Sequence, residues 1–112
     1  MNRTDPTRVL LVEDQQLIRR GLAMHLTTAD GIDVIAQAED GHAALDILST
    51  TEVDVVLTDA RMPGMDGVEL TTRSAQEYPG LPVLVLTTFD DYAVVQAALA
   101  AGACGILRKD TS

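Results

Sequence analysis

The sequence predicts an α/β fold in which a parallel sheet lies between layers of helices. Short apolar runs rich in Val, Ile and Leu recur along the chain, and longer segments with helical spacing of apolar residues separate them. Strands that are apolar throughout are typical of parallel sheets, because both faces of such sheets are buried. The 112 residues, 46% of them hydrophobic, suffice for one domain with one core.

The first helix is predicted to follow the first strand closely. Residues 1–7 are polar and are expected to form a disordered leader, whereas the apolar run at 9–12 predicts a strand. Asp14 is suited to cap the next helix, because its carboxylate can accept from a free N–H at the helix start. Apolar residues recur at four-residue steps in that helix: Ile18, Leu22 and Leu26.

The middle of the chain continues the alternation and ends in a loop. Residues 32–38 predict a second strand, and Asp40 marks the start of a second helix. The apolar run at 53–57 predicts a third strand that ends shortly before Asp59. Residues 61–67, RMPGMDG, are dense in turn residues and predict a loop.

Two more strands and two more helices complete the predicted fold. Asp90 or Asp91 is expected to cap the last helix, and Gly102 to end it. The other elements predicted here are a helix at 68–78, a strand at 81–86 and a strand at 105–108.

Composition excludes several classes of protein. Eight basic and 17 acidic side chains give a net charge of −9, which disfavours contact with nucleic-acid phosphates or anionic lipid. A single cysteine, Cys104, cannot form an internal disulfide, so a reducing compartment is expected. No apolar run reaches the roughly 20 residues of a membrane span, and no secretion leader opens the chain. The sequence predicts a soluble, cytoplasmic domain without a membrane partner.

Polar residues that follow the predicted strands indicate where a ligand would bind. In open parallel sheets, ligands bind beyond the carboxyl ends of the strands. The residues expected on that rim are Glu13, Asp14, Asp59, Thr87, Thr88 and Lys109. Neighbouring carboxylates repel one another unless a cation joins them, and an all-oxygen set suits a hard ion. Few protein ligands with several waters suit Mg²⁺ better than Ca²⁺. A carboxylate beside Mg²⁺ can attack phosphorus, with Lys109 and Thr87 stabilising the phosphoryl oxygens.

A simpler interpretation is that these acidic residues cap helices. It stays open for Asp14 and is favoured for Asp40 and Asp91, whereas a loop separates Asp59 from the next helix. Lys109 taken alone is an ordinary surface charge. The rim positions taken together favour a shared site.

Four segments carry a resemblance to a known family. The sequences LVED at 11–14, LTDARMPGMDG at 57–67, LTT at 86–88 and RK at 108–109 resemble the receiver domain of bacterial two-component response regulators. Residues 86–91 and 101–110 are most similar to the NarL/LuxR-type transcription regulators. The resemblance covers residues 8–110, and a receiver domain at 8–112 is expected. It implies a flavodoxin-like (CheY-like) five-stranded parallel sheet with strand order 2-1-3-4-5.

The resemblance also implies roles for individual residues. Asp59 would accept phosphate from a sensor histidine kinase. The domain would then be a phosphoacceptor, able to catalyse its own phosphorylation and dephosphorylation, and not an enzyme. Thr87 and Lys109 would contact the phosphoryl group. The residues implied to hold Mg²⁺ are Glu13, Asp14, Asp59 and the backbone carbonyl of Arg61. The candidate switch surface comprises Thr88, Phe89, Tyr92 and Ile106, and ordinary packing stays an alternative for Phe89 and Tyr92.

The chain departs from the usual receiver pattern in three places. Ile106 stands where many receivers have an aromatic residue, and Asp110 stands where many have proline. Receivers continue into a fifth helix, whereas this chain stops at Ser112, and a DNA-binding helix-turn-helix domain would lie outside it. Without the fifth helix an apolar sheet face is left uncovered, so self-association is expected.

Two alternative functions remain open at this point. A small phosphatase using an aspartyl-phosphate usually has a second aspartate two positions after the nucleophile, where this chain has Arg61. A phosphate-independent interaction module usually lacks one of the rim residues, and here all are present. His25, His42 and Cys104 have no metal-ligand or catalytic neighbours in the sequence and are expected to be ordinary surface or packing residues.

Overall fold

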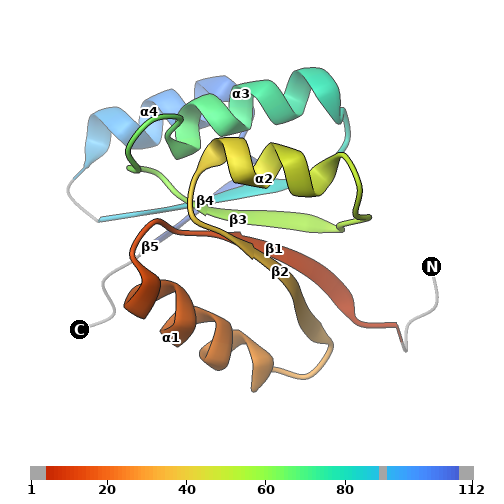
Figure 1. Cartoon of the computed structure of the whole chain (residues 1–112). Helices are drawn as coiled ribbons and strands as arrows, with labels where there is room; N and C mark the ends of the chain where they lie inside the picture. Colours follow the sequence, from red (N-terminus) through yellow and green to blue (C-terminus); the bar gives the residue numbers. More distant parts are fainter. Residues whose placement is uncertain (1–4, 89–90, 109–112) are drawn as a thin grey trace.

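Five parallel strands form one sheet in the computed structural model, which describes residues 5–88 and 91–108. The strand order is β2-β1-β3-β4-β5, and helices connect successive strands (Figure 1). The elements are β1 (Thr7–Val12), α1 (Gln16–Thr27), β2 (Ile32–Ala38), α2 (Gly41–Leu48), β3 (Val55–Asp59), α3 (Gly67–Glu77), β4 (Val83–Thr87), α4 (Tyr92–Ala101) and β5 (Gly105–Arg108). The predicted α/β class and the flavodoxin-like strand order are confirmed. None of these helices is long and apolar enough to cross a membrane.

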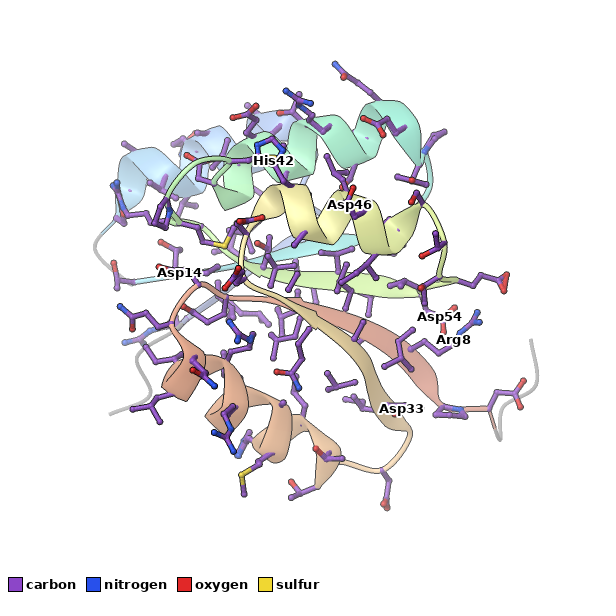
Figure 2. The ribbon with its side chains drawn as sticks, viewed as in Figure 1. Arg8, Asp14, Asp33, His42, Asp46 and Asp54 are labelled. Carbon is purple, nitrogen blue, oxygen red and sulfur yellow. The ribbon has the colours of Figure 1, made fainter. Side chains whose placement is uncertain are left out.

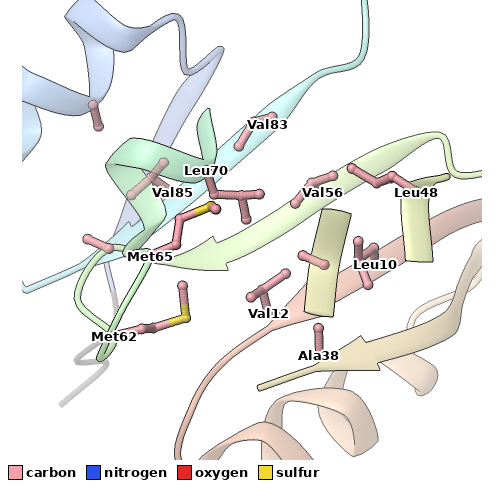
Figure 3. Packing of buried hydrophobic residues seen from close by; sticks show 13 residues of the cluster. Leu10, Val12, Ala38, Leu48, Val56, Met62, Met65, Leu70, Val83 and Val85 are labelled. Atoms are coloured by element: carbon pink, nitrogen blue, oxygen red, sulfur yellow. The ribbon is translucent and has the colours of Figure 1, made fainter. Parts of the chain in front are cut away.

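The two faces of the sheet are covered unequally. Helices α2, α3 and α4 lie on one face, and α1 lies on the other (Figure 1). Leu10 and Val12 of β1 belong to a large buried cluster with Val56, Leu70 and Val85 (Figure 3). The alternate residues of β1 belong to a smaller cluster on the α1 side, with core members Val9, Leu11, Ala23, Leu57 and Leu86. This alternation along β1 confirms that the strand is buried on both faces.

The strand boundaries differ from the predicted ones. Thr7, expected in the leader, is the first residue of β1. Strand β3 begins and ends two residues later than predicted, so that Asp59 is its last residue and pairs with Leu86 of β4. Strand β4 begins at Val83 and not at residue 81, because Pro82 has no N–H for the ladder.

An ion pair lies just before the start of β3. Asp54 precedes the strand, and its carboxylate accepts from the backbone N–H of Arg8 at 2.8 Å and from Arg8 Nε and Nη2 at 3.1 and 3.0 Å. Glu52 lies 3.3 Å from the same guanidinium. Figure 2 shows Arg8 and Asp54 together at the end of the sheet opposite Asp14. These hydrogen bonds hold the pKa of the Asp54 carboxyl below its usual range.

The helix starts confirm one capping prediction and correct another. Asp40 caps α2 by accepting from the N–H of Ala43 at 2.8 Å, as predicted. Asp14 does not cap α1, because Gln15 occupies the N-cap position and makes no side-chain capping bond. The Gln15 N–H donates instead to Glu13 Oε2, which keeps residues 13–15 in a turn at the edge of the sheet.

The remaining helices agree with the prediction to within a residue. Helix α3 starts at Gly67, one residue early, because Asp66 caps it by accepting from the N–H of Glu69 at 2.9 Å. Asp91 occupies the N-cap position of α4 but makes no side-chain capping bond. Gly102 ends α4 with a φ of 109°, a conformation that favours glycine.

Candidate functional site

Three carboxylates meet at the carboxyl edge of the sheet. Glu13 and Asp14 follow β1, and Asp59 ends the neighbouring β3. One carboxylate oxygen from each residue lies within 4.8 Å of those of the other two. Glu13 is fully buried and Asp59 is 4% exposed, while Asp14 is half-buried. The predicted convergence of these three side chains is therefore present in the structure.

Backbone contacts fix the position of Glu13. Its N–H donates to the carbonyl of Ala38 at 3.0 Å, which extends the pairing of β1 with β2 by one residue. Its carbonyl accepts from Arg19 at 2.7 Å, and its Oε2 accepts from the Gln15 N–H at 2.9 Å. These bonds hold the side chain at the start of the turn that leads into α1.

Asp59 is fixed by the strand that it ends and by the loop that follows. The N–H of Ala60 donates to the carbonyl of Leu86 at 2.9 Å, so the pairing of β3 with β4 continues past Asp59. The N–H of Gly67 donates to the carbonyl of Ala60 at 2.9 Å and closes the loop. A Cβ at position 67 would lie 2.1 Å from the Asp59 carbonyl oxygen, a close approach that requires glycine.

A cavity of about 260 Å³ lies beside the acidic cluster. Thr87, the last residue of β4, is 5% exposed and lines it together with Asp59. The full lining is Asp14, Gln15, Asp59, Ala60, Arg61, Thr87, Thr88 and Asp91. The structure thus places a hydroxyl and the predicted phosphoacceptor around the same space.

The side chain of Arg61 has a contact that the sequence did not predict. Its Nε and Nη2 donate to Asp91 at 2.7 and 3.1 Å, which joins the loop after β3 to the start of α4. The guanidinium lowers the pKa of the Asp91 carboxyl and the carboxylate raises the pKa of Arg61. The sequence assigned Arg61 only a backbone role. No local pattern indicates a pair between residues that lie 30 positions apart.

The other residues of the predicted site differ in their exposure and in whether they line the cavity. Thr88 is exposed and lines the cavity, whereas Tyr92 is 73% exposed on α4. Ile106 is half-buried and packs against the larger core cluster. Lys109 and Phe89 lie outside the described residues.

Three residues that the sequence analysis set aside are all exposed. They are His25, His42 and Cys104. Within the part of the chain that the structure describes, only the Glu13, Asp14 and Asp59 set could hold a metal ion among groups of three or more potential ligand residues. Its donors are carboxylate oxygens, which suit a hard cation such as Mg²⁺.

Comparisons with known proteins agree with the geometry. The profile of the family described as "Response regulator receiver domain" matches residues 9–112. Transcriptional regulatory protein LnrK of Bacillus subtilis (strain 168) is 42% identical over 105 residues, which cover 94% of this chain and 48% of that protein. Nitrate/nitrite response regulator protein NarP of Escherichia coli (strain K12) is 34% identical over 111 residues, covering 99% of this chain and 52% of that protein. The chain thus spans about half the length of the curated relatives it matches.

A solved structure shows the same fold. The signal receiver domain of a NarL response regulator from Mycobacterium tuberculosis superposes with a TM-score of 0.87 at 37% identity, covering 96% of this chain and 87% of that one. The five-stranded sheet and the match over residues 9–112 thus agree with the resemblance that the sequence carries. The chain belongs to the response regulator receiver domain family of two-component systems, and its relatives are transcription regulators of the NarL/LuxR type.

Proposed function

We propose that this domain is cytoplasmic, that Asp59 accepts a phosphoryl group from a sensor histidine kinase, and that this modification switches the domain. The supporting observation is the position of Asp59, which ends β3 within 4.8 Å of two other carboxylates and lines a cavity with Thr87. A carboxylate oxygen of Asp59 attacks phosphorus, and the bond from phosphorus to the donor imidazole nitrogen breaks. The electron pair of that bond stays on the nitrogen.

The residues around Asp59 have distinct parts in this reaction. Glu13, Asp14, Asp59 and the carbonyl of Arg61 would hold Mg²⁺, which supplies positive charge opposite the phosphoryl oxygens when bound. The Thr87 hydroxyl donates a hydrogen bond to one of these oxygens, and Lys109 contributes a second positive charge, as the family resemblance implies. The switch surface would include Thr88, Phe89, Tyr92 and Ile106.

Phosphorylation by a small donor tests the proposal directly. Wild-type protein incubated with acetyl phosphate and Mg²⁺ is expected to gain the mass of one phosphoryl group, in a form cleaved by hydroxylamine. Asp59→Asn should abolish the gain. Asp66→Asn is the matched control, since Asp66 lies in the same loop and only caps α3. Equal labelling of Asp59→Asn and wild type would contradict the assignment.

Two other functions make different predictions. A small phosphatase would hydrolyse a generic ester such as p-nitrophenyl phosphate with turnover. The exposed Arg61 occupies the position where such enzymes carry an acid or base, so no turnover is expected. A phosphate-independent module would bind its partner equally well as wild type and as Asp59→Asn.

The output proposed for the whole protein is control of transcription through a DNA-binding helix-turn-helix domain outside this chain. Relatives about twice as long as this chain are transcriptional regulatory proteins. The net charge of −9 is the wrong sign for DNA contact by the receiver itself. Footprinting with the full-length protein should show protection that depends on phosphorylation, and protection that is identical for Asp59→Asn would contradict the proposal.

Self-association with a second copy of the chain is proposed for the sheet face beside α1. An apolar hollow of about 290 Å³ lies there, and Leu107 at its edge is 43% exposed. The lining residues are Thr7, Val9, Leu26, Ile32, Val55, Leu57, Leu84 and Leu107. Contact with a second copy would remove this apolar surface from water, which is energetically favourable.

Sedimentation equilibrium tests this self-association. Wild type is expected to dimerise and Leu107→Glu to be monomeric. Leu99→Glu is the matched control, because Leu99 is similarly exposed at 49% but lies on α4 at the other face. A monomeric wild type at high protein concentration would refute the proposal.

A further inference from the structure

Asp91 differs from the other aspartates that begin helices in this chain. Asp40, Asp66 and Asp91 each occupy an N-cap position. Asp40 and Asp66 accept capping hydrogen bonds at 2.8 and 2.9 Å, whereas Asp91 makes none. The same residue type at the same position therefore performs a different task at the start of α4.

The backbone of Asp91 reflects this difference. Asp40 and Asp66 have ψ values of 177° and 179°, the extended conformation that directs a side chain toward the first turn of the helix. Asp91 has a ψ of 68°. Arg61 is the main cause of the low pKa of the Asp91 carboxyl, and the N–H of Val94 makes a smaller contribution. The Val94 N–H is thus close to the carboxylate, although the Asp91 side chain makes no capping hydrogen bond.

Both carboxylate oxygens of Asp91 are bound by Arg61 instead. The two hydrogen bonds run from Nε and Nη2 of the guanidinium at 2.7 and 3.1 Å, a two-point contact with a defined direction. The Asp91 side chain is 18% exposed and the Arg61 side chain 72%. The pair therefore holds the start of α4 against the loop after β3, with the arginine on the solvent side.

The pair lies beside the space that a phosphoryl group on Asp59 would enter. Arg61 and Asp91 both line the cavity that contains Asp59 and Thr87. A phosphoryl group adds about 1.5–2 negative charges and three acceptor oxygens. These charges attract a guanidinium and repel a carboxylate that line the same cavity.

We propose that Arg61 exchanges partners on phosphorylation: its guanidinium releases Asp91 and binds the phosphoryl group. The released Asp91 carboxylate then caps α4 by accepting a hydrogen bond from the N–H of Val94. This inference rests on the proposed phosphorylation of Asp59. The exchange changes the first turn of α4 from uncapped to capped.

Helix α4 is suited to respond to such a change. Ala98 is the buried residue of this helix, and Val94 and Val95 are half-buried. Few large side chains therefore anchor α4 to the sheet. A change at its first residue can shift the balance between two positions of the helix, as a change in population of existing states.

The sign of one measurement separates partner exchange from a simple tether. If Arg61 only tethers the start of α4, then Arg61→Gln loosens the first turn and speeds hydrogen exchange there. If Arg61 withholds Asp91 from capping, then Arg61→Gln frees the carboxylate and slows exchange. The two models predict opposite changes in unphosphorylated protein.

The experiment follows hydrogen exchange of the Val94 amide by NMR. In unphosphorylated protein, Arg61→Gln is expected to slow this exchange about fivefold, the factor that a typical capping bond contributes. Phosphorylated wild type should show the same slowing, and Asp91→Ala should show none in either state. Arg73→Gln is the matched control, since Arg73 forms an exposed pair with Glu69 on α3, and no change at Val94 is expected for it.

Unchanged or faster exchange at Val94 in Arg61→Gln would overturn the partner exchange. Slowing in phosphorylated Asp91→Ala would also overturn it, because no carboxylate is then present to cap the helix. Wild type that is not labelled on Asp59 would overturn the proposed function instead. Labelling is measured by mass before the exchange experiment, so the two failures are distinguishable.

Discussion

Gly67 and Gly21 are both helical glycines, and alanine is expected to have opposite effects at the two positions. Helix propensity alone predicts that alanine stabilises the protein at either position, by up to about 1 kcal/mol in a helix interior. Gly21 lies in the middle of α1 on its exposed side, where a new Cβ has no atom within 4 Å, so the full gain is expected. At Gly67 the new Cβ would lie 2.1 Å from the Asp59 carbonyl oxygen and 2.9 Å from the Ala60 Cα.

The clash at Gly67 outweighs the propensity gain. Ordinary contact begins at 3.4 Å, so the backbone around Asp59 would have to move by more than 1 Å. Overpacking of this kind costs about 1–3 kcal/mol, and stretching the hydrogen bond from Gly67 to Ala60 removes about 1 kcal/mol more. After the propensity gain, a net loss of about 1–3 kcal/mol remains.

Urea denaturation followed by far-UV circular dichroism measures both variants. Gly67→Ala should unfold at lower urea than wild type and Gly21→Ala at higher urea, with unchanged m-values. The displaced backbone should also slow phosphorylation of Asp59 in Gly67→Ala, but not in Gly21→Ala. A Gly67→Ala protein as stable as wild type would refute the close approach on which this reasoning depends.

Three other predictions concern the core, pH and the metal. Leu70→Ala empties a fully buried position and should lower the free energy of unfolding by about 2–5 kcal/mol, whereas the exposed Leu17→Ala should change it by less than about 0.5 kcal/mol in the same urea assay. Asp54→Asn should make stability less sensitive to acid: Arg8 lowers the folded pKa of Asp54, so its contribution is complete above the unfolded pKa near 3.8 and is lost as pH falls through the lower folded pKa. The measurement is the free energy of unfolding against pH below about 5, roughly one unit above the unfolded pKa. Equal slopes for wild type and Asp54→Asn would contradict this linkage. Mg²⁺ at 100 times its Kd should stabilise wild type by about 2.7 kcal/mol, and Asp14→Asn should need more Mg²⁺ for the same rise in Tm; identical Mg²⁺ dependence would exclude Asp14 as a ligand.

The sequence predicted the sheet because its signals are repeated and cooperative. Each predicted strand is rich in apolar residues, and parallel topology brings the ends of such strands to one edge without further information. The convergence of Glu13, Asp14 and Asp59 follows from this topology, and the structure brings these three side chains together. Strand order came from the family resemblance and not from the periodicity.

Element boundaries and side-chain partners depend on contacts between distant residues. Asp54, just before β3, binds Arg8, 46 positions earlier. Gln15, and not Asp14, occupies the N-cap position of α1. Asp91 has the residue type of a cap, but Arg61 takes its carboxylate. The Asp54–Arg8 and Asp91–Arg61 pairs join residues 46 and 30 positions apart, so local sequence does not encode them.

The two ends of the sheet treat acidic residues in opposite ways. At the amino end, the carboxylate of Asp54 is neutralised by Arg8, an arrangement that stabilises the fold. At the carboxyl edge, three carboxylates converge, and Arg61, the arginine that lines the adjoining cavity, is paired with Asp91. Like charges at this distance favour unfolding unless a cation offsets them. The carboxylate of the first cluster is thus neutralised within the fold, whereas the second is an all-carboxylate set that could hold the Mg²⁺ of the proposed phosphoryl transfer to Asp59.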